Sequence, residues 1–112
     1  MAISEKIQNT ENQVEDEDYI MGKYGRERER HLRENRPKLY ASLKSSGELT
    51  NHLIEIDKEA KEMKLTLIDQ MKKKEGVNSE LQKTDFFEYL RRLQTIEYEA
   101  DNTVMRELIL TM

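Results

Sequence analysis

The sequence predicts an all-α fold, and three observations carry that prediction. Strong helix formers are abundant, and charged residues make up 38% of the chain. Four Gly and one Pro are too few for a β-sandwich or a loop-rich fold. Apolar residues recur every three or four positions over long stretches, as in helices with one buried face. We expect short N-terminal helices followed by a long antiparallel helical hairpin, with a dimeric bundle as one possible assembly.

The chain of 112 residues has enough material for one domain. Residues 1–18 show no apolar period and are rich in acidic and amide side chains. Such a segment cannot bury enough surface to offset its ordering entropy, so we predict an acidic flexible arm. Residues 19–112 are predicted to form a single helical domain, with order beginning near Tyr19.

Two short helices are expected at the start of this domain. Gly22 and Gly25 should break the chain before a charged helix from about residue 26 to 35. Pro37 suits the first turn of the next helix, because its missing N–H would be unpaired there. Gly47 suits the left-handed position that ends many helices.

The clearest pattern begins at Leu49 and predicts a long amphipathic helix that ends at Gly76. Its apolar stripe consists of Leu49, Leu53, Ile56, Ala60, Met63, Leu67 and Met71. The last helix should open at Asn78 or Ser79, or restart at Thr84, and continue to Leu110. We expect the methionines and Phe86-Phe87 to fill the core. A homodimer would cover the surplus apolar residues, which are Leu65, Ile68, Met105 and Ile109.

Charge is strongly partitioned along the chain, although the net charge is only -4. Residues 1–20 carry a net charge of -5, residues 21–44 carry +5, and residues 45–112 carry -4. An acidic arm therefore precedes a basic segment, which is the main electrostatic feature of the sequence.

The residue types argue against catalysis, a cofactor or a metal. Without Cys there is no thiolate ligand or cysteine nucleophile. His52 has helical spacing to Glu55 and Glu59, but such pairs are common in a Glu-rich chain, and we expect His31 and His52 to be structural. No apolar run approaches the roughly 20 residues of a membrane span, and the first residues do not resemble a signal peptide. We predict a non-enzymatic, soluble, cytoplasmic protein without a membrane partner.

The basic segment is the candidate binding site for a partner or for phosphate. It contains Lys23, Tyr24, Arg26, Arg28, Arg30, Arg33, Arg36, Lys38 and Tyr40. Arg binds phosphates through two parallel hydrogen bonds and Tyr stacks on bases, so these residues suit nucleic acid. Two alternatives stay open: a solvated helix laced with Arg–Glu ion pairs, or a surface for an acidic protein.

The acidic run formed by Glu15, Asp16, Glu17 and Asp18 allows three interpretations. It can act as a solubilising arm, which is the commonest case. It can mask the basic segment. It can also imitate phosphate and occupy a nucleic-acid channel on a partner.

Several runs of residues resemble the TnpV family of transposon-encoded proteins over residues 21–110. They include Gly22-Lys23-Tyr24-Gly25-Arg26, Arg36-Pro37, Ser46-Gly47-Glu48-Leu49, Glu75-Gly76-Val77 and Glu107-Leu108-Ile109. The resemblance implies residence on a mobile genetic element of a Gram-positive host. The chain departs from the family pattern at Glu88-Tyr89, where we expect Glu-Trp.

From these features we expect a binding protein of a mobile element that antagonises a host nucleic-acid-processing defence complex, such as a CRISPR-associated nuclease. The alternative is a DNA-binding accessory or regulatory factor of transposition that uses residues 23–38. The partner is expected to be a host protein or nucleoprotein complex, with DNA as a second candidate.

Overall fold

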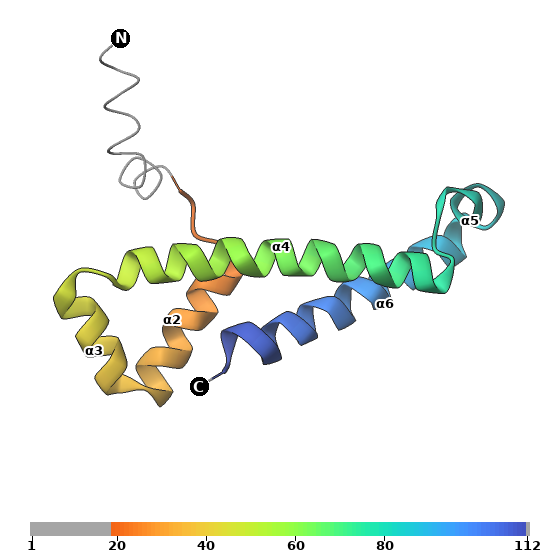
Figure 1. The fold of residues 1–112 in the computed structure, drawn as a ribbon. Helices are drawn as coiled ribbons and strands as arrows, with labels where there is room; N and C mark the ends of the chain where they lie inside the picture. The colour runs from red at the N-terminus through yellow and green to blue at the C-terminus, as the bar shows by residue number, and fades with distance from the viewer. Residues whose placement is uncertain (1–18, 112) are drawn as a thin grey trace, which may run out of the picture. The chain divides into compact units, whose positions relative to one another are not determined.

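The computed structural model describes residues 19–111, and every regular element among them is helical (Figure 1). The elements are α2 (Lys23–Asn35), α3 (Pro37–Ser46), α4 (Leu49–Glu75), α5 (Ser79–Thr84), α6 (Phe86–Val104) and the π-helical turn η1 (Met105–Ile109). The all-α prediction is confirmed. The predicted acidic arm lies outside the described residues.

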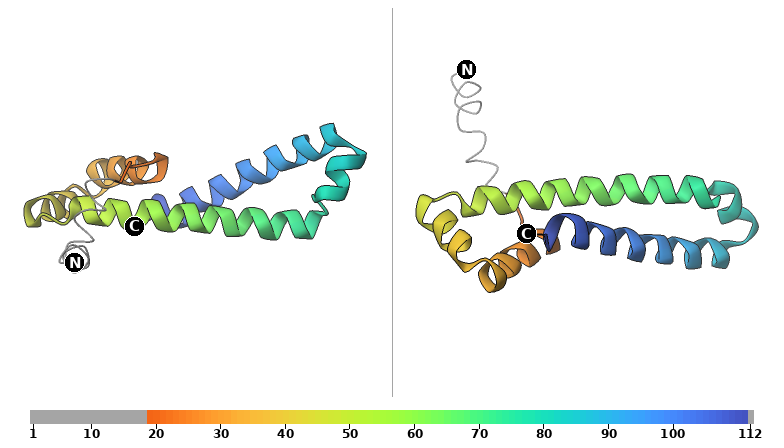
Figure 2. Two further views of the ribbon diagram at one scale, coloured as in Figure 1. Left: turned by 90° about the horizontal axis from the view of Figure 1, so that it is seen from above. Right: turned by 60° about the horizontal axis from the view of Figure 1, so that its bottom comes forward.

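The chain divides into two compact units, residues 1–57 and residues 58–112, and α4 begins in the first and ends in the second. Within the described part of the first unit, α2 and α3 lie side by side in all views (Figures 1 and 2). The Tyr40 hydroxyl of α3 donates a hydrogen bond to the Glu29 carboxylate of α2 at 3.3 Å. The prediction of a single domain over residues 19–112 stays a prediction.

The prediction that Gly25 breaks the chain was wrong. Helix α2 begins at Lys23, three residues before the predicted start, and Gly25 lies within its first turn. A Cβ atom at Gly25 would overlap the Met21 side chain and lie 3.3 Å from the Asp57 Cβ. Position 25 therefore requires glycine, because Met21 and Asp57 approach its backbone closely. The helix tolerates the low helix propensity of glycine because these neighbours pack against it.

The predicted end of α3 is confirmed in detail. Gly47 has φ of 80°, and its N–H donates to the Lys44 carbonyl at 3.2 Å. The N–H of Glu48 reaches back to the Leu43 carbonyl at 2.9 Å. These two bonds form a Schellman motif, which satisfies carbonyls that the helix end would leave unpaired.

The predicted stripe of α4 is confirmed, because none of its seven members is among the exposed residues. Leu53 and Ala60 are buried, and the others are partly buried. Gly76 ends the helix as predicted, with φ of 69°. The N–H of the following Val77 donates to the Lys72 carbonyl at 2.9 Å, and the Val77 side chain is buried.

The last part of the chain does not form one helix from Thr84 to Leu110. Helix α5 ends at Thr84, α6 starts at Phe86, and η1 follows α6. The break between α5 and α6 has a local cause, because each helix has its own N-cap residue and the two caps lie seven residues apart. Asn78 Oδ1 accepts from the Leu81 N–H at 3.0 Å, and Asp85 Oδ1 accepts from the Glu88 N–H at 3.2 Å.

Two contacts within the second unit join the second half of α4 to α6. Lys64 Nζ lies 3.7 Å from Asp101 Oδ1, and Arg92 Nη1 donates to the Glu75 carbonyl at 3.3 Å. The chain reverses direction between these helices at α5 (Figure 2). A stable helical hairpin and a dimeric bundle stay predictions.

The core of the second unit contains Ala60, Val77, Ile96, Ala100, Val104 and Ile109. Two predictions about apolar residues were wrong. Ile109 is fully buried and therefore not a surplus apolar residue, whereas Phe86 and Phe87 are 48% and 82% exposed and therefore not core filler.

Candidate nucleic-acid interface on α2

Helix α2 separates its charged residues onto two faces. Tyr24, Arg28 and Leu32 are buried and spaced four residues apart, so they form its inner face. Lys23, Arg26, Arg30 and Arg33 are exposed and spaced three, four and three residues apart, so they share one outer face. We call these four residues the α2 basic face.

The α2 basic face gathers four of the five cations of α2 on one side of the helix, with Glu27 and the exposed Glu34 beside them. Arg28 points inward, and the carboxylate of Glu29 is engaged by Tyr40. The distance along the helix axis from Lys23 to Arg33 is about 15 Å at 1.5 Å per residue. The sequence contains the spacing of these cations, but the spacing places Lys23 on this face only once α2 is known to begin at Lys23.

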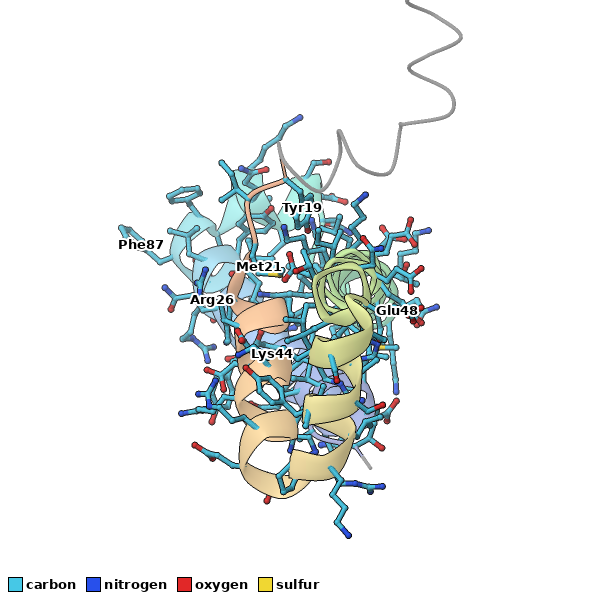
Figure 3. The ribbon with its side chains drawn as sticks, turned by 90° about the vertical axis from the view of Figure 1, so that its left-hand side faces the viewer. Tyr19, Met21, Arg26, Lys44, Glu48 and Phe87 are labelled. Atoms are coloured by element: carbon cyan, nitrogen blue, oxygen red, sulfur yellow. The ribbon has the colours of Figure 1, made fainter. Side chains whose placement is uncertain are left out.

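Two arginines of the face have local contacts that orient them. Arg26 Nη1 donates to the Met21 carbonyl at 2.8 Å, and Arg26 lies on the side of α2 away from α3 (Figure 3). Arg30 Nη2 donates to Glu27 Oε1 at 2.5 Å, with the Arg30 side chain 57% exposed. An exposed i, i+3 pair of this kind is worth only about 0.2–0.5 kcal/mol, so an incoming anion can compete for Arg30.

The start of α2 is held by a buried carboxylate from α4. Asp57 is fully buried and accepts hydrogen bonds from the Tyr19 hydroxyl at 2.5 Å, the Gly22 N–H at 3.0 Å and the Gly25 N–H at 2.8 Å. The first N–H groups of a helix lack partners within it and favour negative charge. Asp57 therefore supplies the cap that Gly22, without a side chain, cannot supply to α2.

Sequence reasoning missed this role of Asp57. A signal was present, because Asp57 lies four residues after Leu53 and three before Ala60, inside the apolar stripe. A carboxylate at such a position is rarely buried without partners. Asp57 fixes both the start of α2 and the direction in which its basic face points.

The inner face of α2 contains a second polar contact. Arg28 Nε donates to His52 Nε2 at 3.4 Å, which requires the His52 ring to be neutral and protonated on Nδ1. Burial lowers the pKa of His52, the nearby Arg28 charge lowers it further, and Glu55 opposes both. Burial also lowers the pKa of Arg28. His52 is therefore a packing partner of Arg28.

The remaining predicted site residues lie around these two faces. Tyr24 is 5% exposed, so its ring packs inside the unit, with Lys23 Nζ 5.7 Å from the ring centroid. Arg36 and Lys38 are exposed at the junction of α2 and α3. Tyr40 is partly buried, and Lys44 Nζ lies 5.8 Å from its ring centroid. The acidic run Glu15–Asp18 lies outside the described residues.

Two kinds of feature are absent from residues 19–111. No group of three or more His, Cys, Asp or Glu side chains is arranged to hold a metal ion in this part of the chain. No helix in the same range is long and apolar enough to cross a membrane.

One comparison with known proteins gives a match. A family model described as "Transposon-encoded protein TnpV" matches residues 6–109. No curated protein and no solved structure matches the chain.

Proposed function

Because the chain belongs to the TnpV family of transposon-encoded proteins, we propose that it is a non-enzymatic accessory protein of a transposon that binds duplex DNA through the α2 basic face. The observation that carries this proposal is the alignment of Lys23, Arg26, Arg30 and Arg33 along one exposed side of a helix. The protein acts in the host cytoplasm, where the transposon DNA is located.

The dimensions of the face suit a phosphate backbone. Duplex DNA carries one phosphate charge per about 1.7 Å of its axis when both strands are counted, so about 15 Å of duplex offers more phosphates than four cations can contact. Four cations on a face of that length can each approach one phosphate of the duplex. This contact gives affinity and position without reading the base sequence.

The charges beside the α2 basic face leave its cations available to DNA phosphates. The first turn of α2 contains no acidic residue, and the buried Asp57 carboxylate from α4 offsets the positive end of the helix dipole beside Lys23 and Arg26. Glu27 is the acid paired with Arg30, and that pair is exposed and weak. Breaking the pair between Arg30 and Glu27 therefore takes away little of the free energy that a phosphate gains by binding Arg30.

Fluorescence anisotropy of a labelled duplex tests the proposal. The wild-type protein is expected to bind at low salt, and Arg26→Glu with Arg30→Glu is expected to weaken binding at least about tenfold, because two of four phosphate contacts become repulsive. Circular dichroism should show unchanged helix content, since both side chains are exposed.

A matched control separates a local interface from a general effect of net charge. Lys73→Glu with Lys74→Glu changes the net charge by the same amount at two exposed positions near the end of α4. This variant is expected to bind DNA within roughly twofold of the wild type, because neither lysine belongs to the α2 basic face. Equal losses in the two double variants would overturn the assignment to α2.

The second candidate is an inhibitor of a CRISPR-associated or related host nuclease complex. This candidate function is supported by the net charge of -5 in residues 1–20, because an acidic segment suits a partner that normally holds nucleic acid. A protein that binds no duplex at low salt, but is retained by a purified nuclease complex and slows its cleavage, supports this candidate. In that case the α2 basic face contacts an acidic protein surface.

A further inference from the structure

The α2 basic face lies next to the point where the acidic run Glu15–Asp18 joins the described part of the chain. Arg26 Nη1 donates to the Met21 carbonyl at 2.8 Å, so one cation of the face already contacts the backbone that leads to the run. Tyr19, the first residue after the run, is held by its hydrogen bond to the buried Asp57. The run therefore joins the chain at a fixed point near the start of the face.

The chain between the run and the face is short enough for the two to meet. An extended chain spans at most about 3.6 Å per residue, so Asp18 lies within about 11 Å of Met21 and Glu15 within about 22 Å. The α2 basic face is about 15 Å long. A short tether of this kind holds two groups at an effective concentration in roughly the millimolar range, so even weak ion pairs between them form.

The charges of the two segments are complementary. Residues 1–20 carry a net charge of -5, and residues 21–44 carry +5. The run has four carboxylates on consecutive residues, and the face has four cations along one side of a helix. Carboxylate and phosphate both accept two parallel hydrogen bonds from an Arg guanidinium. The acidic run is therefore a competitor of phosphate that the chain itself carries.

The strength of this competition follows from the number of ion pairs. Side chains on consecutive residues do not all point to one side, so two or three of the four carboxylates can face α2 at the same time. An exposed ion pair changes an equilibrium constant by roughly a factor of two. Two or three such pairs therefore lower the affinity of the face for another anion by about four- to eightfold.

From these observations we propose that the acidic run, which lies outside the described residues, binds the α2 basic face and competes with DNA for it. This inference rests on the proposed function, because it concerns the same face. Duplex DNA carries one phosphate charge per about 1.7 Å of its axis, so it displaces the weaker pairs of the run. The run is thus an autoinhibitory segment that lowers the affinity for DNA without abolishing binding.

Titration of a labelled duplex at low salt tests this proposal on the full chain. The variant that combines Glu15→Gln, Asp16→Asn, Glu17→Gln and Asp18→Asn is expected to bind about four- to eightfold more tightly than the wild type. The matched control makes the same change of net charge at four exposed glutamates of the second unit, Glu62, Glu97, Glu99 and Glu107, each replaced by Gln. This control is expected to bind within roughly twofold of the wild type. Equal gains in the two variants, or no gain in the first, overturn the proposal.

A second measurement needs no DNA, so it separates this inference from the proposed function. NMR spectra of the Arg side chains compare the Nε–H signals of Arg30 and Arg33 in the wild type and in the variant of the acidic run. Both signals are expected to shift when the run is neutralised. The signal of Arg91, which binds Glu88 in the second unit, should stay in place.

The two measurements together distinguish the possible failures. Unchanged Arg30 and Arg33 signals overturn the contact between the run and the face. If these signals shift while neither the wild type nor the variant binds duplex, the contact is supported and DNA binding through α2 is wrong.

Discussion

Replacing Asp57 by alanine removes the group that holds the start of α2. The substitution takes away the acceptor of the hydrogen bonds from the Tyr19 hydroxyl and from the N–H groups of Gly22 and Gly25. It also removes the negative charge at the N-terminus of the helix. The side chain is fully buried, so water cannot replace it without a change in structure.

The size of the effect follows from these contacts. A hydrogen bond to a charged group contributes about 1.5–3 kcal/mol, and a buried donor left without a partner costs about 1–3 kcal/mol. These bonds share one acceptor and do not add fully, so we expect a loss of about 3–5 kcal/mol. A small protein has a free energy of unfolding of only about 5–15 kcal/mol, so the variant should be barely stable.

Urea unfolding followed by circular dichroism measures this loss. With an m-value of about 1.5 kcal/mol/M, the midpoint should fall by about 2 M or more. Asp57→Asn keeps one oxygen acceptor and should lose less, about 1–2 kcal/mol. Glu62→Ala, an exposed carboxylate on the same helix, should change stability by less than about 0.5 kcal/mol. An Asp57→Ala variant as stable as Glu62→Ala would refute the reasoning.

Three further predictions concern single residues. Gly25→Val should destabilise the fold by about 2–3 kcal/mol in the same assay, because its side chain overlaps Met21; equal or greater stability would contradict the packing. The free energy of unfolding should fall as the pH drops below about 6.5. His52 in the unfolded chain gains a proton there, whereas the lowered pKa of His52 in the folded chain opposes protonation of its ring. His52→Gln should reduce the loss of stability between pH 6.5 and 5.5. An unchanged pH profile of stability in this variant would show that other groups cause the loss. Asp85→Ala should cost about 1 kcal/mol through loss of the α6 cap, and no change in thermal midpoint argues against that cap.

Patterns that depend on local sequence predicted much of the fold. The stripe from Leu49 to Met71 predicted α4 and its buried side, because apolar spacing reflects the helical period directly. Gly47 and Gly76 were placed correctly at helix ends, because a positive φ is a strong local requirement for glycine. These features need no knowledge of distant parts of the chain.

Features that depend on distant partners were not predicted. Gly25 lies inside α2 because Asp57, 32 positions later, occupies the adjacent space and binds its N–H. Arg28 is buried because His52 accepts from it, so one of the five arginines proposed for a partner packs inside the protein. Composition shows that the segment is basic, and the spacing of its cations places four of them on one face once α2 is known to begin at Lys23.

The exposed aromatic residues at the start of α6 show a different limit of prediction from the sequence. An apolar side chain at helical spacing is buried more often than exposed, so Phe86-Phe87 were assigned to the core. The Asp85 cap starts α6 directly before them and thereby sets which way both rings point. The face that results could not be inferred from spacing alone.

The salt dependence of DNA binding tests the central claim most directly, because it counts the phosphates that the protein contacts. Four contacts by the α2 basic face predict a slope of about -3.6 for the logarithm of the association constant against the logarithm of the salt concentration. Arg26→Gln with Arg30→Gln, which removes two of the four, should reduce the slope to about -1.8. A slope that this double variant leaves unchanged, or no binding by the wild type even at low salt, would contradict DNA binding through α2.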